Sequence, residues 1–325
     1  MVPENATESG VETARLDERL VVTTTGLTKR FKTVTAVDGI DLRIPRGVVC
    51  GFVGPNGAGK TTTIRMLLGL VRPGAGSGHV LGVPLTHPAG YLGRVGALIE
   101  GPAFYPTLSA RANLVALARL GGIDTRGIDG LLERVDLKGR ARDQFRTYSL
   151  GMKQRLGIAA ALLPEPELLV LDEPANGLDP AGIVEVRHLL RILADDGITV
   201  FVSSHLLAEI EQICDHLVMI HQGRLVFQGP VSGLTAAQGS EILARPERPE
   251  DAPALVDLAI KNGRTARLVD GVVHVSADLA WAGPFNRLAM GAGITLVHLS
   301  QHTSSLEDAF FRLVQAPPDD PRGAE

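Results

Sequence analysis

Nine consecutive residues have the composition and spacing of a phosphate-binding loop: Gly54-Pro55-Asn56-Gly57-Ala58-Gly59-Lys60-Thr61-Thr62. The glycines let the main chain wrap closely around an anion and aim its N–H groups inward. A helix that begins near Lys60 would add the partial positive charge of its N-terminus, and the ammonium of Lys60 adds a full one. This arrangement offsets the charge of the β- and γ-phosphates of a nucleotide, with the hydroxyl of Thr61 placed to ligate Mg²⁺. The alternative is that these residues form a glycine-rich turn with a surface lysine and bind no phosphate.

Two acids and a histidine follow two apolar runs further along the chain. Asp172 and Glu173 come directly after Leu168–Leu171, and His205 follows Thr199–Val202 and two serines. Buried parallel strands deliver such side chains to their carboxyl edge, where open α/β sheets bind ligands. There Asp172 would hold Mg²⁺, Glu173 would orient or deprotonate an attacking water, and His205 would bind a γ-phosphate oxygen. Without the phosphate loop, the two acids would indicate a solvated strand end and the histidine a structural role.

The elements that must position these groups alternate between short β-branched runs and amphipathic helices from about residue 20 to 235. This alternation predicts an α/β domain with a largely parallel sheet. A helix-rich insert occupies about 98–163. The expected strands are 48–53, 168–171, 199–202, 216–220 and 224–228, and the expected helices are 60–70, 181–194 and 206–214.

The pattern changes after Leu234, where residues 240–315 predict a small α+β domain of order βαββαβ, similar to a ferredoxin-like unit. Its expected strands are 241–244, 266–268, 272–275 and 294–299, and its expected helices are 252–260, 285–290 and 306–314. Ser304 to Glu307 offers a capping box for the last helix. We expect the ends of the chain, 1–19 and 316–325, to be disordered tails.

Composition restricts the class of protein. The 325 residues carry 32 basic and 36 acidic side chains, a formal net charge of −4, so we expect no nucleic-acid partner. The basic stretch around Arg140 and Arg142 is interpreted as a solvated surface. Two cysteines, Cys50 and Cys214, exclude a disulfide framework and fit a reducing cytosol. No apolar run is long enough to span a membrane, and the polar first residues lack the pattern of a signal peptide, so we expect neither feature.

A second candidate anion site comes from Tyr148-Ser149-Leu150-Gly151-Met152, in which a serine precedes an expected helix N-terminus. This pentapeptide resembles the signature motif of ABC transporter ATP-binding subunits, which usually reads LSGGQ. Asn176-Gly177-Leu178-Asp179 is similar to the D-loop of that family, and His205 to its switch histidine. Phe31 stands where the family places an aromatic ring against adenine.

The resemblance spans about residues 21–235 and implies a P-loop NTPase (RecA-like) core with a helical subdomain at about 98–163. It also implies that the chain binds ATP and Mg²⁺ and dimerises, with itself or a similar subunit, around two ATP molecules. Ser149 would then meet the γ-phosphate of ATP held by the partner, and Lys60, Glu173 and His205 would act in hydrolysis.

Ser305 to Phe310 resembles the end of one branch of the family, the exporters of drugs and antibiotics similar to bacitracin and daunorubicin resistance ATPases. That branch implies a separate multi-span membrane subunit and a position at the cytoplasmic face of the membrane. The transported substrate would be a drug, an antibiotic or another amphiphile.

Two positions depart from the family pattern. Glu100 stands where the family has the Q-loop glutamine; it can still ligate Mg²⁺ but adds a negative charge near Glu173. Met152 replaces the glutamine of the signature motif and cannot donate its hydrogen bond, whereas Ser149 and Gly151 keep the phosphate-facing chemistry. The rigid aromatic segment 101–106 suits either docking of a membrane subunit's coupling helix or ordinary core packing.

Two other functions remain as alternatives. A non-transport ABC ATPase acting on ribosomes or DNA would usually carry tandem cassettes or a long coiled coil, and this chain has one phosphate loop, one signature and no heptads. A regulatory module that binds ATP without hydrolysis is disfavoured by the complete set of Lys60, Asp172, Glu173 and His205.

Overall fold

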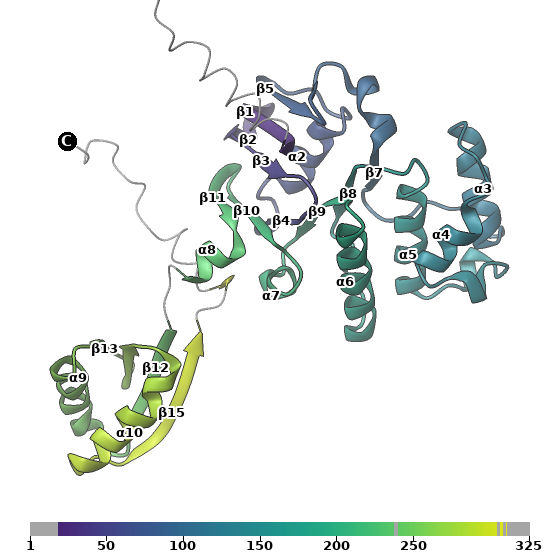
Figure 1. Cartoon of the computed structure of the whole chain (residues 1–325). Helices are drawn as coiled ribbons and strands as arrows, with labels where there is room; N and C mark the ends of the chain where they lie inside the picture. The colour runs from purple at the N-terminus through teal and green to yellow at the C-terminus, as the bar shows by residue number, and fades with distance from the viewer. Residues whose placement is uncertain (1–18, 237–239, 304–305, 308–309, 311–325) are drawn as a thin grey trace, which may run out of the picture. The chain divides into compact units, whose positions relative to one another are not determined.

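The computed structural model describes residues 19–236, 240–303, 306–307 and 310. The chain divides between Val231 and Ser232 into two compact units. Each unit has its own sheets and its own hydrophobic core, and the two are described separately (Figure 1).

The first unit contains an antiparallel sheet built from the N-terminal part of the chain. Its strand order is β2-β1-β5-β6, with β3 paired to β1. The strands are β1 (Leu20–Phe31), β2 (Val34–Ile40), β3 (Arg43–Pro45), β5 (Ala75–Val80) and β6 (Val83–Pro84). Ala36 in β2 borders the phosphate loop, since its carbonyl oxygen lies against Gly59.

The second sheet of this unit has six strands in the order β11-β10-β4-β9-β8-β7, all parallel to their neighbours except the edge strand β11. The strands are β4 (Val49–Val53), β7 (Val95–Leu98), β8 (Leu168–Asp172), β9 (Thr199–Ser204), β10 (His216–His221) and β11 (Arg224–Pro230). The hairpin β10–β11 turns at Gln222 and Gly223, whose φ angles of 48° and 80° suit a tight two-residue turn.

Three central strands, β4, β8 and β9, are buried at every residue, so both faces of the sheet are covered. Cys50 and Phe52 point to one face and join the core that contains Ile64 of helix α2 and the antiparallel sheet. Gly51 points to the other face, where a Cβ atom would lie 2.4 Å from the side chain of Ile210. Alternate residues of β4 therefore pack against α2 and the antiparallel sheet on one face of the six-stranded sheet, and against α7 on the other face.

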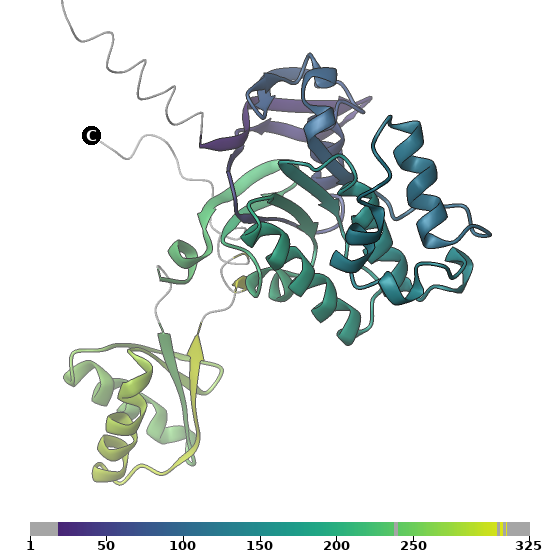
Figure 2. The same cartoon turned by 45° about the vertical axis from the view of Figure 1, so that its right-hand side comes forward.

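Helices α3, α4 and α5 lie between β7 and β8 in the sequence and cluster beyond the β7 edge (Figures 1 and 2). The helix-rich insert expected from the sequence over about 98–163 covers the residues of these three helices. The helices of the unit are α2 (Lys60–Leu67), α3 (Ala110–Leu120), α4 (Ile128–Arg134), α5 (Leu150–Ala161), α6 (Pro180–Asp195) and α7 (Leu207–Glu211), and α8 (Val231–Ala236) begins at the division.

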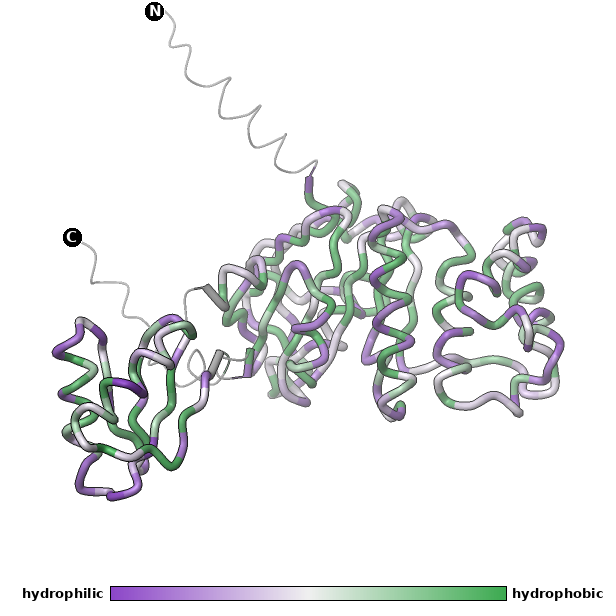
Figure 3. The backbone as a smooth tube through the Cα atoms, turned by 60° about the horizontal axis from the view of Figure 1, so that its bottom comes forward, coloured by the Kyte–Doolittle hydropathy of each residue, from purple (hydrophilic) through white to green (hydrophobic). Residues whose placement is uncertain are grey.

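The second unit has the predicted order βαββαβ, and its four strands form an antiparallel sheet of order β13-β14-β12-β15. Trp281 stacks on Phe285 with 5.0 Å between ring centroids, beside the core that both helices share with the sheet. Hydrophobic and hydrophilic stretches alternate along the backbone of this unit (Figure 3). The elements are β12 (Ser240–Pro246), α9 (Ala252–Lys261), β13 (Thr265–Val269), β14 (Val272–Ser276), α10 (Ala282–Gly291) and β15 (Leu296–Thr303).

Several elements begin or end a few residues away from the sequence-based expectation, and two of these differences have a clear local cause. Helix α7 ends at Glu211 rather than at 214, because the chain turns at Cys214 and Asp215 to enter β10, and Asp215 accepts a hydrogen bond from the Val49 N–H. Strand β15 begins at Leu296 rather than at 294, because Ile294 is still bonded to the end of α10 through the Ala289 carbonyl. The expected helix 306–314, the capping box at Ser304 and both expected tails lie wholly or largely outside the described residues.

Candidate nucleotide-binding and catalytic site

The phosphate loop connects the end of β4 at Val53 to the start of α2 at Lys60, as the sequence predicts. Gly57 and Gly59 have φ angles of 82° and 106°, in the region that favours glycine. A Cβ atom on Gly59 would lie 2.4 Å from the Ala36 carbonyl oxygen, and one on Gly54 would lie 2.3 Å from that of Ile220. The loop is therefore closely backed by main chain from β2 and β10, which fixes its path around an anion.

Lys60 is 6% exposed and places its ammonium inside the loop. Its Nζ donates a hydrogen bond to the Gly54 carbonyl oxygen at 2.7 Å and lies 3.3 Å from Oε1 of Glu173. A cation this enclosed interacts strongly with nearby anions because little water screens it. The first residue of α2 and the end of β8 thus meet in one electrostatic cluster.

Asp172 lies between two hydroxyl groups. Thr61 donates to its Oδ2 at 2.9 Å, and Ser203 donates to its Oδ1 at 2.5 Å. The Ser203 hydroxyl also accepts a hydrogen bond from the Glu173 N–H at 3.0 Å. The parallel register of β8 and β9 pairs Asp172 with Ser203, so neighbouring strands hold the carboxylate in one orientation.

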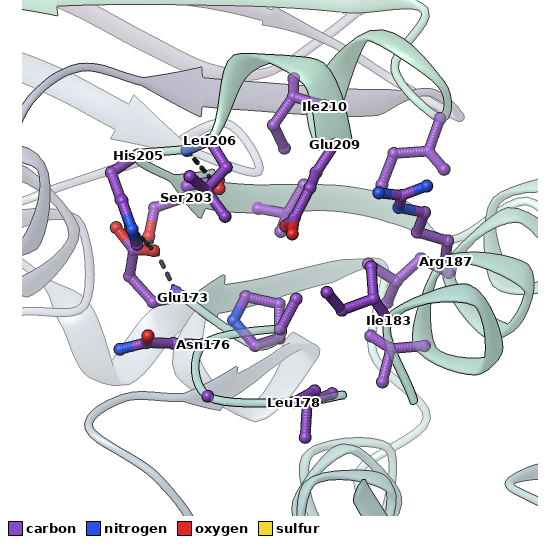
Figure 4. A pocket seen from close by; sticks show the side chains of 18 residues that line it. Glu173, Asn176, Leu178, Ile183, Arg187, Ser203, His205, Leu206, Glu209 and Ile210 are labelled. Atoms are coloured by element: carbon purple, nitrogen blue, oxygen red, sulfur yellow. Dashed lines mark hydrogen bonds and ion pairs between the residues drawn. The ribbon is translucent and has the colours of Figure 1, made fainter. Parts of the chain in front are cut away.

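Glu173 follows β8 with a φ angle of 51°, an uncommon conformation for a residue with a side chain. This backbone conformation accompanies two contacts of its carboxylate, one with Lys60 and one with Nδ1 of His205 at 2.8 Å. The close-up shows His205 and Glu173 facing each other from the ends of their strands (Figure 4). Strained backbone at a charged cluster is typical of functional sites.

A cavity of about 100 Å³ lies beside this pair, lined by residues of the segment 173–178 and of α6 and α7 (Figure 4). Most of its lining side chains are aliphatic, including Ile183 and Ile210. Glu209 also lines it, and burial raises the pKa of this carboxyl group. The D-loop residues therefore border a cavity that separates them in part from α6 and α7.

The candidate signature residues lie on a different element, the N-terminus of α5. Ser149 caps this helix, since its hydroxyl accepts a hydrogen bond from the Met152 N–H at 3.2 Å. Asp179 caps α6 in the same way, accepting from the Gly182 N–H at 3.0 Å. Leu150 links the two helix starts, because a Cβ atom on Gly177 would lie 3.3 Å from its side chain. The signature and D-loop segments of one chain are thus in contact.

Two further predicted residues lie at or just after the ends of strands. The Phe31 ring is 46% exposed at the end of β1, with the Lys29 ammonium 5.2 Å from its centroid. Glu100 follows β7 with a φ angle of 59°, and its carboxylate forms an ion pair with Arg65 of α2. Both partners of this pair are partly exposed.

Sequence reasoning missed the roles of Ser203 and Arg65. Pairing the two predicted strands in parallel would have placed Ser203 beside Asp172, so a register argument could have found it. Arg65 carries no such signal, because its contact with Glu100 depends on how the loop after β7 turns back toward α2.

The loop between β4 and α2, with a buried lysine at the start of the helix and carboxylates at the end of a neighbouring parallel strand, has the arrangement of a P-loop NTPase fold. A sequence profile described as ABC transporter matches residues 37–176. The bacitracin transport ATP-binding protein BcrA of Bacillus licheniformis is 40% identical over 297 residues, which cover 90% of this chain and 97% of the relative. The daunorubicin/doxorubicin resistance ATP-binding protein DrrA of Streptomyces peucetius is 35% identical over 313 residues, covering 92% and 94%. The chain belongs to the ABC transporter family, as one of its ATP-hydrolysing subunits.

A solved structure agrees with this assignment of the fold. CbiO1 from Clostridium perfringens, part of the ABC transporter complex cbiONQ, matches with a TM-score of 0.62 and 26% identity, over 67% of this chain and 92% of that one. Within the described residues, no helix is both long and apolar enough to cross a bilayer.

Proposed function

We propose that this chain forms an ATP-bound dimer, with itself or with a similar subunit, and drives export of a drug, an antibiotic or another amphiphile through a separate multi-span membrane protein. The cluster of Lys60, Asp172, Glu173 and His205 is the observation that carries the hydrolytic part. The export direction and substrate class rest on the similarity to the bacitracin and daunorubicin proteins over nine-tenths of the chain. In this proposal the chain works at the cytoplasmic face of the membrane.

The residues present fit a magnesium ion. The Thr61 hydroxyl and the Asp172 carboxylate lie 2.9 Å apart, and both are the oxygen donors that Mg²⁺ prefers. No group of three or more His, Cys, Asp or Glu residues in the described part of the chain forms a closed metal site. An ion held by Thr61 and Asp172, with phosphate oxygens and water among its other ligands, fits these oxygen donors. Bound there, Mg²⁺ would neutralise charge on the β- and γ-phosphates.

The reaction then divides among the residues of the loop and the strand ends. Lys60 and the N–H groups of 54–59 bind the phosphates. Glu173 accepts the proton of a water whose oxygen bonds to the γ-phosphorus, while the bond from that phosphorus to the β-phosphate oxygen breaks and ADP leaves. His205 contacts the γ-phosphate and, through its bond to Glu173, fixes the orientation of the carboxylate.

The remaining predicted residues complete a two-chain site in the proposal. Phe31, half-exposed at the end of β1, stacks on adenine. Ser149 and Gly151 meet the γ-phosphate bound by the partner, with Met152 contributing its main chain, and Asp179 lies at the same interface. Each chain would supply its phosphate loop to one ATP and its signature segment to the other.

We also propose that Glu100 ligates Mg²⁺, which requires its carboxylate to exchange Arg65 for the ion. The next residues, 101–104, line a cavity of about 370 Å³ with α3 and α5, and Tyr105 is 63% exposed beside them. This apolar groove, at the junction of the sheet and the helical insert, suits a short helix of the membrane subunit.

The alternative of a ribosome- or DNA-acting ATPase has no support among the relatives described above, which are transport and resistance proteins. The direct test uses Glu173→Gln. This variant should bind ATP, form a dimer by size-exclusion chromatography and hydrolyse at least about a hundredfold more slowly, because the amide cannot accept the water proton. Asp195→Asn, a carboxylate-to-amide change on α6, serves as the control. Hydrolysis at the wild-type rate, or a monomer with saturating ATP, would refute the proposal.

A further inference from the structure

Arg155 lies on the signature helix α5 and is 11% exposed, although its charge is not part of the nucleotide site. One terminal nitrogen, Nη1, donates to the Asp136 carboxylate at 3.0 Å and to the Asp136 carbonyl oxygen at 3.2 Å. The other, Nη2, lies 3.4 Å from Oε2 of Glu185 on α6. The guanidinium therefore bridges the turn after α4 to the helix that follows the D-loop.

The same two helices also touch at their N-termini. Leu150, the first residue of α5, lies against Gly177 of the D-loop, and Leu178 of the D-loop lies near Gly151 of α5. Arg155 follows the α5 cap by six residues, and Glu185 follows the α6 cap by six residues. The helices are thus held at two levels, one apolar at their starts and one ionic about a turn and a half further on.

The strengths of the two halves of the bridge differ. The contacts with Asp136 are within hydrogen-bond distance and lie inside the helical insert. The contact with Glu185 is longer than a charge-assisted hydrogen bond, and the Glu185 side chain is 53% exposed. The hydrogen bonds to Asp136 therefore fix Arg155 within the helical insert. Its longer contact with Glu185 is the one that can change when α6 moves.

We infer that Arg155 and Glu185 are positioning residues that couple the signature segment to the D-loop of the same chain. The inference rests on the proposed dimer, in which Ser149 serves one ATP and Glu173 serves the other. Asn176 donates its N–H to the Glu173 carbonyl oxygen, so a shift of α6 reaches the catalytic carboxylate through the D-loop. The ion pair then passes a displacement of one helix to the other and so couples the two ATP sites. Neither Arg155 nor Glu185 touches ATP.

The test measures cooperativity of ATP hydrolysis by the full chain, with two variants that approach the pair from opposite sides. Glu185→Gln removes the acceptor charge at a half-exposed position, which favours retention of the fold. Arg155→Lys keeps the positive charge but replaces the planar fork, whose two terminal nitrogens serve Asp136 and Glu185 separately, with one ammonium group. Asp195→Asn is the matched control, since it breaks an ion pair with Arg191 within α6 and does not reach α5.

Both variants should lower kcat by about two- to tenfold, the range of substitutions along coupling networks, and reduce the Hill coefficient toward about 1. KM for ATP should stay near the wild-type value in both variants because the phosphate loop is unaltered, and the thermal midpoint should stay near wild type in Glu185→Gln, whose side chain is half-exposed. A merely structural role would lower the thermal midpoint and leave the Hill coefficient unchanged. The Asp195→Asn control should match wild type in every measurement.

Two results distinguish a failure of the coupling role from a failure of the proposed function. A cooperative wild type with equally cooperative Glu185→Gln and Arg155→Lys variants would overturn the coupling role and leave the proposed function standing. A wild type that neither dimerises with ATP nor hydrolyses it would overturn the proposed function, and the coupling role with it.

Discussion

Three glycines of the phosphate loop differ in what an added methyl group would meet, and this predicts three different costs. At Gly57 the space is open, but φ is 82°. At Gly54 φ is not positive, but the methyl carbon would lie 2.3 Å from the Ile220 carbonyl oxygen. At Gly59 both problems occur together, with a φ of 106° and a carbonyl oxygen of β2 at 2.4 Å.

The magnitudes follow from these geometries. Left-handed backbone in alanine costs about 1–2 kcal/mol, so Gly57→Ala should destabilise the first unit by that amount. Overpacking against main chain costs about 1–3 kcal/mol, because the oxygen must move by about 1 Å, and this is the expected effect of Gly54→Ala. Gly59→Ala should combine the two, at about 2–5 kcal/mol if the terms add.

The assay is chemical denaturation followed by circular dichroism, paired with binding of a fluorescent ATP analogue. Gly59→Ala should show the lowest midpoint and lose analogue binding, since moving α2 displaces Lys60 and the N–H groups of its first turn. Gly139→Ala, at a position with open space and no positive φ, is the control and should resemble wild type. If Gly59→Ala were no less stable than Gly57→Ala, the steric part of the reasoning would be wrong.

Three more predictions concern single side chains. Ser203→Ala should leave the affinity for ATP near wild type and lower kcat about tenfold, because Asp172 loses an orienting donor; an unchanged kcat would contradict this. Burial lowers the pKa of His216, so the unfolded chain binds the proton first as pH falls below about 6.5 and stability drops. His216→Gln should lose less stability than wild type between pH 7 and 5, measured by denaturant midpoints, and equal losses would refute the assignment. Arg65→Met, which removes the partner of Glu100, should lower the Mg²⁺ concentration for half-maximal hydrolysis, whereas Glu100→Gln should raise it; shifts in one direction for both would exclude Glu100 as a ligand.

The sequence predicted the central strands and the helices next to them, and it suggested the strand-end site, because both are encoded by local patterns. An apolar run followed by Asp172 and Glu173 specifies a buried strand and its exit, and the glycine spacing specifies the loop before Lys60. The order of the C-terminal elements was also predictable, since each alternation between β-branched and amphipathic residues is local.

Contacts between distant segments were not predictable in this way. The pairing of Arg65 with Glu100 and the bridge from Arg155 to Glu185 each join segments that are distant in the sequence and are brought together by the tertiary fold. The left-handed backbone of Glu173 is likewise accompanied by contacts from two other elements, through Lys60 and His205. No spacing in the sequence encodes these meetings.

The stacked Trp281 has a practical consequence, because it is the single tryptophan of the chain. Its indole packs on Phe285 with the Arg264 guanidinium 5.5 Å from the ring, entirely within the second unit. Tryptophan emission is therefore an intrinsic optical probe of that unit alone, while the phosphate loop lies in the other. Any change in this emission during a titration with ATP would report, without a label, a signal that has crossed from one unit to the other.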